Sequence, residues 1–192
     1  MEQTIKREKK QAFTTRQMTL VGVITALTCI LAPLSVPLPI TPVPISLTNL
    51  VLYISIFLLG WKLTTVSYLV YLLIGFIGLP VFSGFTGGVA KVAGPTGGYL
   101  IGMLFIAVIS GYILEKGNGN RIIALIAMVI GTMGDYALGT FWLSKLMHTS
   151  FVAALSAGVI PFLPGDALKI IAALILGPML RSRDGRCFFG KD

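Results

Sequence analysis

The sequence predicts an all-α integral membrane protein, built as a bundle of six transmembrane helices with both termini in the cytosol. The 192 residues are 55% hydrophobic and only 11% charged, whereas a soluble domain carries roughly a quarter charged residues. No lysine, arginine, histidine, aspartate or glutamate occurs from Gln17 to Trp61. The mean hydropathy of +0.90 agrees with several apolar segments long enough to cross a hydrocarbon core of about 30 Å.

Two basic clusters flank the apolar region and indicate its orientation. They consist of Lys6, Arg7, Lys9, Lys10 and Arg16 before it, and Arg181, Arg183, Arg186 and Lys191 after it. Both fit the positive-inside pattern of cytosolic flanks, with some attraction to anionic lipid, and neither has the aromatic interleaving of an RNA-binding surface. The net charge of +8 therefore does not predict nucleic-acid binding. The chain is expected to cross a plasma membrane several times.

The predicted organisation is a basic cytosolic segment over 1–16, a six-helix membrane domain over 17–180 and a basic cytosolic tail over 181–192. The first apolar run is too long for a cleavable signal peptide, and no small-residue cleavage site follows the basic stretch at a suitable distance. Cys29 and Cys187 are expected to be too far apart to pair, so both are expected to be reduced.

The first helix is expected from Gln17 to Ala32, and Pro33 ends it. It carries Gly22 and Ala26 on one face, and small residues at this spacing allow close helix packing in lipid. The pair serves either packing within the bundle or docking of a partner, and the spacing leaves both open. Five prolines between Pro33 and Ser46 then forbid a continuous helix and predict an extended connection.

Four further helices follow from the apolar segments and the residues that interrupt them. They are expected over Leu47–Gly60, Leu63–Gly78, Gly97–Leu114 and Ile122–Lys145, and Trp61 and Lys62 join the first two of these. The segment 148–160 is apolar but poorly placed as a full span. Two prolines then restart the chain before a last helix over Gly165–Leu180. With the N-terminus inside, only Lys91 and Lys145 fall on the outer side.

The stretch from Gly78 to Gly102 interrupts the apolar sequence with seven glycines and two prolines before residue 99. It does not match a phosphate-binding loop, because Gly94 is followed by Pro95 and Thr96 rather than by Lys and Ser or Thr. We therefore expect that this chain does not hydrolyse ATP itself. Lys91, the cation within the stretch, either meets an anionic ligand at the outer mouth or is a solvated loop lysine.

Asp166 and Lys169, in the motif PFLPGDALKI, are the sharpest candidates for ligand recognition. Three residues apart, they share one face at the start of the last helix, where a carboxylate and an ammonium can accept from and donate to a small polar ligand. The alternative is structural, with Asp166 capping the helix and Lys169 merely pairing with it. The spacing alone leaves both interpretations open.

The remaining candidates are weaker. Asp135 lies within an apolar helix, where a charge costs at least ~2.5 kcal/mol, so it lines a polar cavity, bonds a neighbour or is protonated. Aromatic side chains could stack on a ligand ring or simply pack, and these are Phe82, Phe85, Tyr99, Tyr136 and Trp142. His148 has no cysteine or carboxylate cluster around it, so neither a metal site nor a catalytic triad is predicted, and we do not expect an enzyme.

Five motifs, in order along the chain, resemble those of the BioY-type biotin transporters, the substrate-binding S components of energy-coupling factor importers. The motifs are PVPISLTNL (42–50), GLPVFSGFTGG (78–88), GPTGGYLIG (94–102), GTFWL (139–143) and PFLPGDALKI (161–170). The resemblance covers 33–177, and the combination of GPTGGYLIG with PFLPGD is its most specific part.

The resemblance implies a six-helix bundle in a bacterial plasma membrane that binds biotin near the outer surface and needs no cofactor. Asp166 would accept from the ureido N–H groups, and Lys169 would meet the carbonyl or the carboxylate. It also implies partners, namely a transmembrane coupling protein and a pair of cytosolic ATPases, which we expect to dock at Gly22 and Ala26. The outer loops would cover the ligand, and the further contacts are expected from Phe82, Gly84, Gly87, Gly88, Lys91, Tyr99, Tyr136 and Trp142.

This chain departs from the family pattern at three positions. Thr48 stands where the family often has glutamine, Phe85 where it usually has glycine, and Asp135 where an apolar residue or a small thiol is expected. Two other functions stay open beside biotin import. One is an S component for another vitamin, and the other is a self-sufficient secondary transporter driven by an ion gradient through Asp135.

Overall fold

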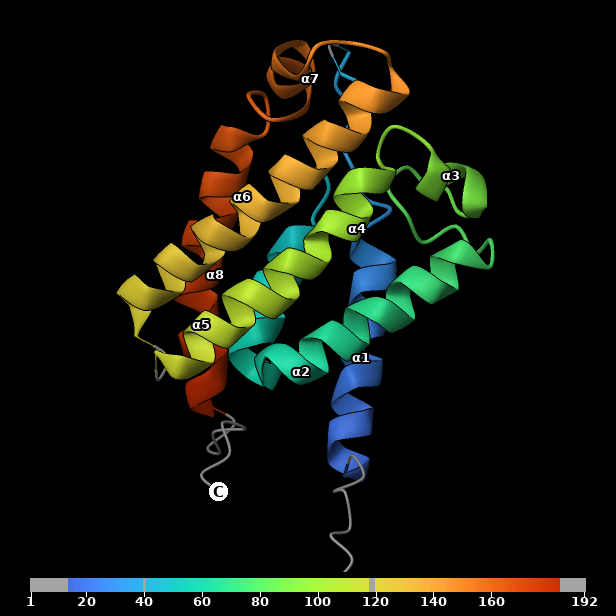
Figure 1. Ribbon diagram of the computed structural model, residues 1–192. Helices are drawn as coiled ribbons and strands as arrows, with labels where there is room; N and C mark the ends of the chain where they lie inside the picture. Colours follow the sequence, from blue (N-terminus) through green and yellow to red (C-terminus); the bar gives the residue numbers. More distant parts are fainter. Residues whose placement is uncertain (1–13, 40, 118–119, 184–192) are drawn as a thin grey trace, which may run out of the picture.

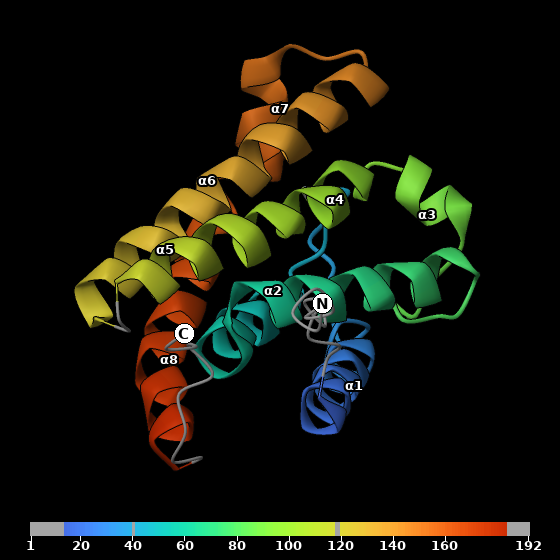
Figure 2. The same ribbon diagram turned by 60° about the horizontal axis from the view of Figure 1, so that its bottom comes forward.

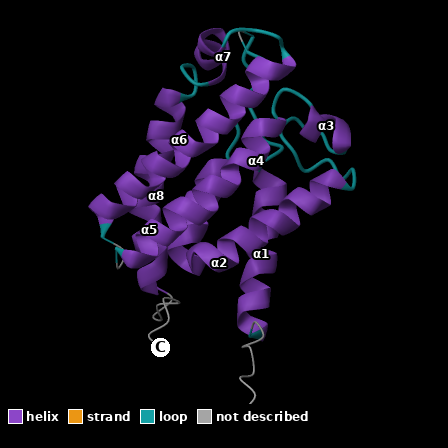
Figure 3. Cartoon of the chain, viewed as in Figure 1, coloured by secondary structure: helices purple, strands orange, loops and turns teal. Residues whose placement is uncertain are grey.

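The computed structural model describes residues 14–39, 41–117 and 120–183, and within them the chain is helical apart from loops and two isolated antiparallel bridges (Figures 1 and 3). The all-α prediction is thus confirmed for these residues. Outside the described residues lie Lys6, Arg7, Lys9 and Lys10 of the first basic cluster, Arg186 and Lys191 of the second, and Cys187.

The elements follow one another as helices of very different length. They are α1 (Thr15–Leu31), α2 (Thr48–Phe76), α3 (Val89–Ala93), α4 (Gly97–Phe105), the π-helix η1 (Ile106–Ser110), α5 (Gly111–Lys116), α6 (Arg121–Leu146), α7 (Phe151–Gly158) and α8 (Leu163–Arg183). Four helical stretches are long and apolar enough to cross a membrane, at 48–76, 97–116, 121–146 and 163–181, while Thr15–Leu31 is a shorter apolar helix.

The start of α1 is fixed by a reciprocal cap. The Thr14 side chain accepts from the Gln17 backbone N–H over 3.3 Å, and Gln17 Oε1 accepts from the Thr14 N–H over 2.9 Å. The helix buries Ile24, Thr25 and Thr28. The hydroxyl oxygens of Thr25 and Ser67 lie 2.9 Å apart, and this hydrogen bond joins α1 to the second half of α2.

α2 bends at Gly60, which has φ 72° and ψ 177°. A residue with a side chain rarely adopts this positive φ, so glycine allows the turn between two helical halves. The predicted division into two helices is therefore present, but the predicted connection through Trp61 and Lys62 is wrong, because both residues already belong to the second half. Figure 2 shows the chain turning sharply within α2.

The glycine-rich stretch is more structured than the sequence suggested, because it contains the short helix α3. Phe82 anchors it: its ring is fully buried, lies over Gly75, where an added Cβ would overlap it, and stands edge-on to Tyr71 with the centroids 5.5 Å apart. The Gly88 N–H donates to the Gly75 carbonyl over 2.7 Å, and the Gly84 N–H donates to the Pro33 carbonyl over 3.1 Å. These contacts attach the stretch to the ends of α1 and α2.

α4 and α6 approach closely through glycines. An added Cβ at Gly98 would overlap Trp142 Cβ and lie 3.1 Å from Gly139 Cα, and one at Gly102 would lie 3.0 Å from Asp135 Cα. Trp142 Nε1 also donates to the Gly94 carbonyl over 2.9 Å. The GPTGGYLIG motif therefore serves first to bring two helix backbones together.

We expect Gly98→Ala to lower the unfolding temperature measured in detergent, because overpacking of this kind costs roughly 1–3 kcal/mol. Gly165→Ala is the matched control, since an added Cβ there meets nothing within 4 Å. Equal unfolding temperatures for the two variants would contradict this account of the α4–α6 contact.

The connections collect at two ends of the molecule. The start of α1, the bend of α2, the α5–α6 junction and the end of α8 lie at one end in Figure 1, whereas α3, α7 and the segment before α2 lie toward the other. The segment before α2 folds on itself through a bridge between Val36 and Ile45, with N···O distances of 2.8 and 2.9 Å. Three connections far apart in sequence thus lie toward the same end of the molecule as the start of α8.

Candidate ligand-binding site

Asp166, in the first turn of α8, collects three side-chain donors. Lys169 Nζ donates to Asp166 Oδ1 over 2.9 Å, and Asn49 Nδ2 donates to the same oxygen over 2.8 Å. The Tyr136 hydroxyl donates to Oδ2 over 2.5 Å. Asp166 is 7% exposed and Lys169 is 9% exposed. Asp166 and Lys169 therefore form a buried ion pair, and the neutral donors Asn49 and Tyr136 also bind the Asp166 carboxylate.

The four side chains come from three helices. Asn49 lies in the first turn of α2, Tyr136 in the middle of α6, and the spacing of three places Asp166 and Lys169 on one face of α8. The hydrogen bonds found for the Asp166 carboxylate in the described part of the chain all come from side chains, so the helix-capping interpretation is not supported.

Two small cavities lie beside this cluster, of about 50 Å³ and about 40 Å³. Each can hold a few water molecules, since one water needs roughly 10–15 Å³. Both are lined by Val43, Pro44, Ser46, Tyr99 and Met103. The first adds Ile45, Asn49, Asp135, Tyr136, Gly158, Phe162, Asp166 and Lys169, and the second adds Thr48, Tyr71, Ser83, Thr96 and Leu100.

Several polar atoms in these walls are buried without a hydrogen-bond partner in the described residues. They are Asn49 Oδ1, Tyr99 OH and Asp135 Oδ1 in the first cavity, and Thr96 Oγ1 in the second, which Tyr99 also borders. Buried polar groups are normally paired, because an unmade hydrogen bond costs about 1–3 kcal/mol. Their concentration here is typical of a site that pairs with a polar ligand.

The structure brings four of the predicted site residues together. Asp166, Lys169, Tyr99 and Tyr136 all line the first cavity. The other predicted contacts line neither cavity: Phe82, Gly84, Gly87, Gly88, Lys91 and Trp142. Phe82 and Trp142 fill packing positions, and the three glycines shape the turn. The exposed Phe85 also lies outside both cavities, with a φ of 55°.

Lys91 is half-buried in α3, and desolvation by this partial burial lowers the pKa of its ammonium below the ordinary value. α3 lies toward the same end of the molecule as α7 and the segment before α2. Lys91 does not line the cavity that contains Asp166. Its contact with a ligand carboxylate stays a prediction.

Sequence reasoning missed several residues of the site. Asn49 was not singled out, although a lone amide in the apolar helix start ISLTNL is a polar group that needs a partner. The segment 43–46 is part of the motif PVPISLTNL, but the sequence predicts no ligand contact for its residues, and the structure places it in the walls of both cavities. Met103 gave no signal, because a methionine in an apolar helix looks like ordinary packing. Within the described residues no group of three or more histidine, cysteine or acidic side chains could hold a metal ion.

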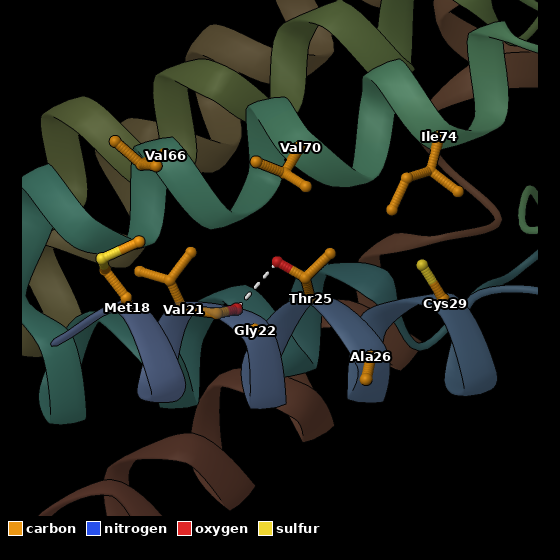
Figure 4. Close-up of a pocket in the computed structure, with 9 residues that line it drawn as sticks. All are labelled: Met18, Val21, Gly22, Thr25, Ala26, Cys29, Val66, Val70 and Ile74. Atoms are coloured by element: carbon orange, nitrogen blue, oxygen red, sulfur yellow. Dashed lines mark hydrogen bonds between the residues drawn. The ribbon is translucent and has the colours of Figure 1, made fainter. Parts of the chain in front are cut away.

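A separate apolar groove of about 470 Å³ runs between α1 and the second half of α2 (Figure 4). Its walls are Met18, Val21, Gly22, Thr25, Ala26, Cys29, Val66, Val70 and Ile74. Gly22 and Ala26 are exposed, and an added Cβ at Gly22 would meet nothing within 4 Å. Packing within the bundle therefore does not explain the small pair, which leaves partner docking as the prediction.

Comparison with known proteins gives consistent matches over nearly the full chain. The model of the BioY family matches residues 5–185. "Biotin transporter BioY" of Thermotoga maritima is 37% identical over 166 residues, covering 86% of this chain and 96% of the relative. "Probable biotin transporter BioY" of Pyrococcus horikoshii is 34% identical over 166 residues, with the same coverage.

A solved structure gives the same answer for the fold. The crystal structure of the S-component for biotin from an ECF-type ABC transporter matches with a TM-score of 0.81 and 32% identity, covering 89% of this chain and 95% of that one. These relatives are named as transporters rather than enzymes, and with its several apolar helices the chain is a multi-pass membrane protein. Because one family model spans 5–185 and relatives above 30% identity align over 86% of this chain, the chain belongs to the BioY family.

Proposed function

We propose that this protein is the substrate-binding subunit of an ATP-driven importer, which captures biotin at the outer face and delivers it inward. The observation that carries the proposal is the buried Asp166–Lys169 pair, braced by Asn49 and Tyr136 beside a cavity with unpaired polar atoms. Relatives of this chain are named as biotin transporters, which supports the choice of ligand.

The chemistry of the site suits a neutral cyclic urea. Biotin's ureido ring offers two N–H donors and one carbonyl acceptor, and its tail ends in a carboxylate. Asp166 provides the acceptor for an N–H, and the Lys169 ammonium provides the donor for the carbonyl. Tyr99 borders both cavities and is placed to contact the ring system across them.

Ligand entry needs movement of the wall, because the two cavities are small. The segment 43–46 borders both of them, and it is held at its base by the Val36–Ile45 bridge. We propose that this segment moves aside to join the two cavities into one ligand site. The glycine-rich stretch and α7 would then cover the outer mouth.

For the membrane topology we propose six spans with both termini in the cytosol. This requires that α1 crosses the membrane and that the two halves of α2 count separately. Aromatic and basic residues at the proposed cytosolic end support it: the Trp61 and Tyr112 rings stand edge-on with centroids 6.2 Å apart, and Lys62 and Lys116 lie over them at 5.7 and 4.6 Å. Such pairs are typical of the membrane–water interface.

Equilibrium binding by the purified protein tests the ligand. We expect saturable binding of biotin and at least about a hundredfold weaker binding of thiamine and riboflavin, because neither offers two N–H groups flanking a carbonyl in the same bicyclic shape. Preference for either of the other vitamins would identify an S component with a different ligand and would contradict the proposal.

The transport mechanism is tested separately, in vesicles. We propose that uptake needs a transmembrane coupling protein and a pair of cytosolic ATPases, in line with the absence of a phosphate-binding loop from this sequence. Ion-driven biotin uptake by the chain alone, without ATPases, would favour the secondary transporter instead.

A further inference from the structure

A second carboxylate, Asp135 of α6, lies in the wall of the cavity that contains Asp166 and Lys169. Asp135 is 5% exposed, and its Oδ1 is buried without a hydrogen-bond partner in the described part of the chain. Gly102 of α4 makes room for it, because an added Cβ there would overlap Oδ1. A carboxylate in such a position destabilises the protein unless something pairs with it.

The hydrogen bonds already made by Asp166 leave too few free acceptor sites for a ligand with two N–H groups. A carboxylate has about four lone-pair sites. Three are taken, by Lys169, Asn49 and Tyr136. Asp166 therefore has room for about one more donor, whereas a cyclic urea brings two N–H groups that point to opposite sides of its carbonyl. The second N–H needs another acceptor in the same cavity.

We propose that Asp135 is this second acceptor, so that the two carboxylates hold the two N–H groups of the ligand while Lys169 donates to its carbonyl. The inference rests on the proposed function, since it concerns how the same site reads its ligand. Asn49 Oδ1 is also unpaired, but the Asn49 amide already donates to Asp166, whereas the Asp135 side chain makes no hydrogen bond within the described residues. Asp135 thus makes this chain selective for ligands with paired N–H donors.

The assignment gives Asp135 opposite effects on stability and on binding. Asp135→Leu removes an unpaired buried polar group and keeps the branched shape of the side chain, so the unliganded protein should unfold at the same or a higher temperature. The same variant should bind biotin at least about tenfold more weakly, because one N–H group of the ligand loses its acceptor. Asp135→Asn keeps one carbonyl acceptor and should lose less affinity than Asp135→Leu.

Thr64→Val is the matched control. Thr64 is fully buried with an unpaired Oγ1, like Asp135, but it lies in the second half of α2 and lines neither cavity. Its variant should bind biotin with unchanged affinity and should not unfold earlier. Both readouts come from the purified full-length chain, by equilibrium biotin binding and by thermal unfolding without ligand.

The outcomes separate the inference from the function on which it rests. Unchanged biotin affinity in both Asp135 variants would overturn the inference, and so would weaker binding that is accompanied by an equal loss of unliganded stability, which indicates a structural role. Failure of the unaltered protein to bind biotin would instead overturn the proposed function.

Discussion

Asp166→Asn is expected to weaken biotin binding by at least about tenfold. The substitution removes the charge from the acceptor that meets the ligand, and a hydrogen bond to a charged group contributes about 1.5–3 kcal/mol. It also disturbs the cluster itself, because Lys169, Asn49 and Tyr136 all donate to this carboxylate. Equilibrium binding of biotin to the purified variant measures the effect.

The loss of affinity has to be separated from a loss of stability. Removing one partner of a buried ion pair leaves the other charge uncompensated and costs roughly 3–5 kcal/mol. Asp166→Asn is therefore expected to unfold at a lower temperature than the unaltered protein. A double variant, Asp166→Leu with Lys169→Met, removes both charges with apolar side chains of similar shape and should recover much of that stability, because apolar replacement of a buried pair is often neutral.

The double variant is expected to be folded and unable to bind biotin. That combination would show that the pair serves recognition rather than support of α8. Near-normal biotin affinity in Asp166→Asn would contradict the assignment and leave the carboxylate with a structural role only.

The sequence predicts the helices here better than the contacts between them. Long apolar runs, prolines and charged turns mark where helices begin and end, because each acts locally on the backbone or on its transfer into lipid. Gly60 illustrates the limit: a lone glycine in an apolar run is compatible with a straight helix, and only tertiary packing decides that it bends.

The sequence predicts those residues of the site that are charged but lie within an apolar segment. Asp166 and Lys169 stand out because charges within an apolar helix need a reason, and the structure places them in one buried cluster. Asn49 and the segment 43–46 belong to the same cluster only through folding over more than a hundred residues, which no local pattern records.

The glycine-rich stretch shows a second limit. Its glycines predict close approach of a ligand, and that contact stays a prediction, while the structure shows close approach of the chain to itself at Gly87. An added Cβ at Gly87 would overlap the Leu79 carbonyl, and the positive φ of Gly84 and Gly88 sets the turns around α3. A high density of glycines indicates that something approaches the backbone closely, but the sequence does not say whether it is a ligand or another part of the chain.

The double substitution Gly22→Leu and Ala26→Leu is expected to abolish biotin uptake by the complete importer while leaving biotin binding unchanged. Both residues line the apolar groove of about 470 Å³ between α1 and α2, and two leucine side chains would replace the small surfaces that they present there. A partner helix that packs closely against small residues would then be excluded. Binding should survive because the groove and the two cavities have no lining residue in common.

Ala137→Leu is the control for this pair, since Ala137 is exposed on α6 and lines neither the groove nor a cavity. It adds the same side chain to another surface of the helix bundle and should leave uptake intact. Uptake in reconstituted vesicles that contain the coupling protein and ATPases, together with biotin binding to each purified variant, distinguishes the cases. Full uptake by the double variant would place the docking surface elsewhere. Loss of binding together with uptake would mean that α1 supports the ligand site through α2, since Thr25 and Ser67 already link these helices.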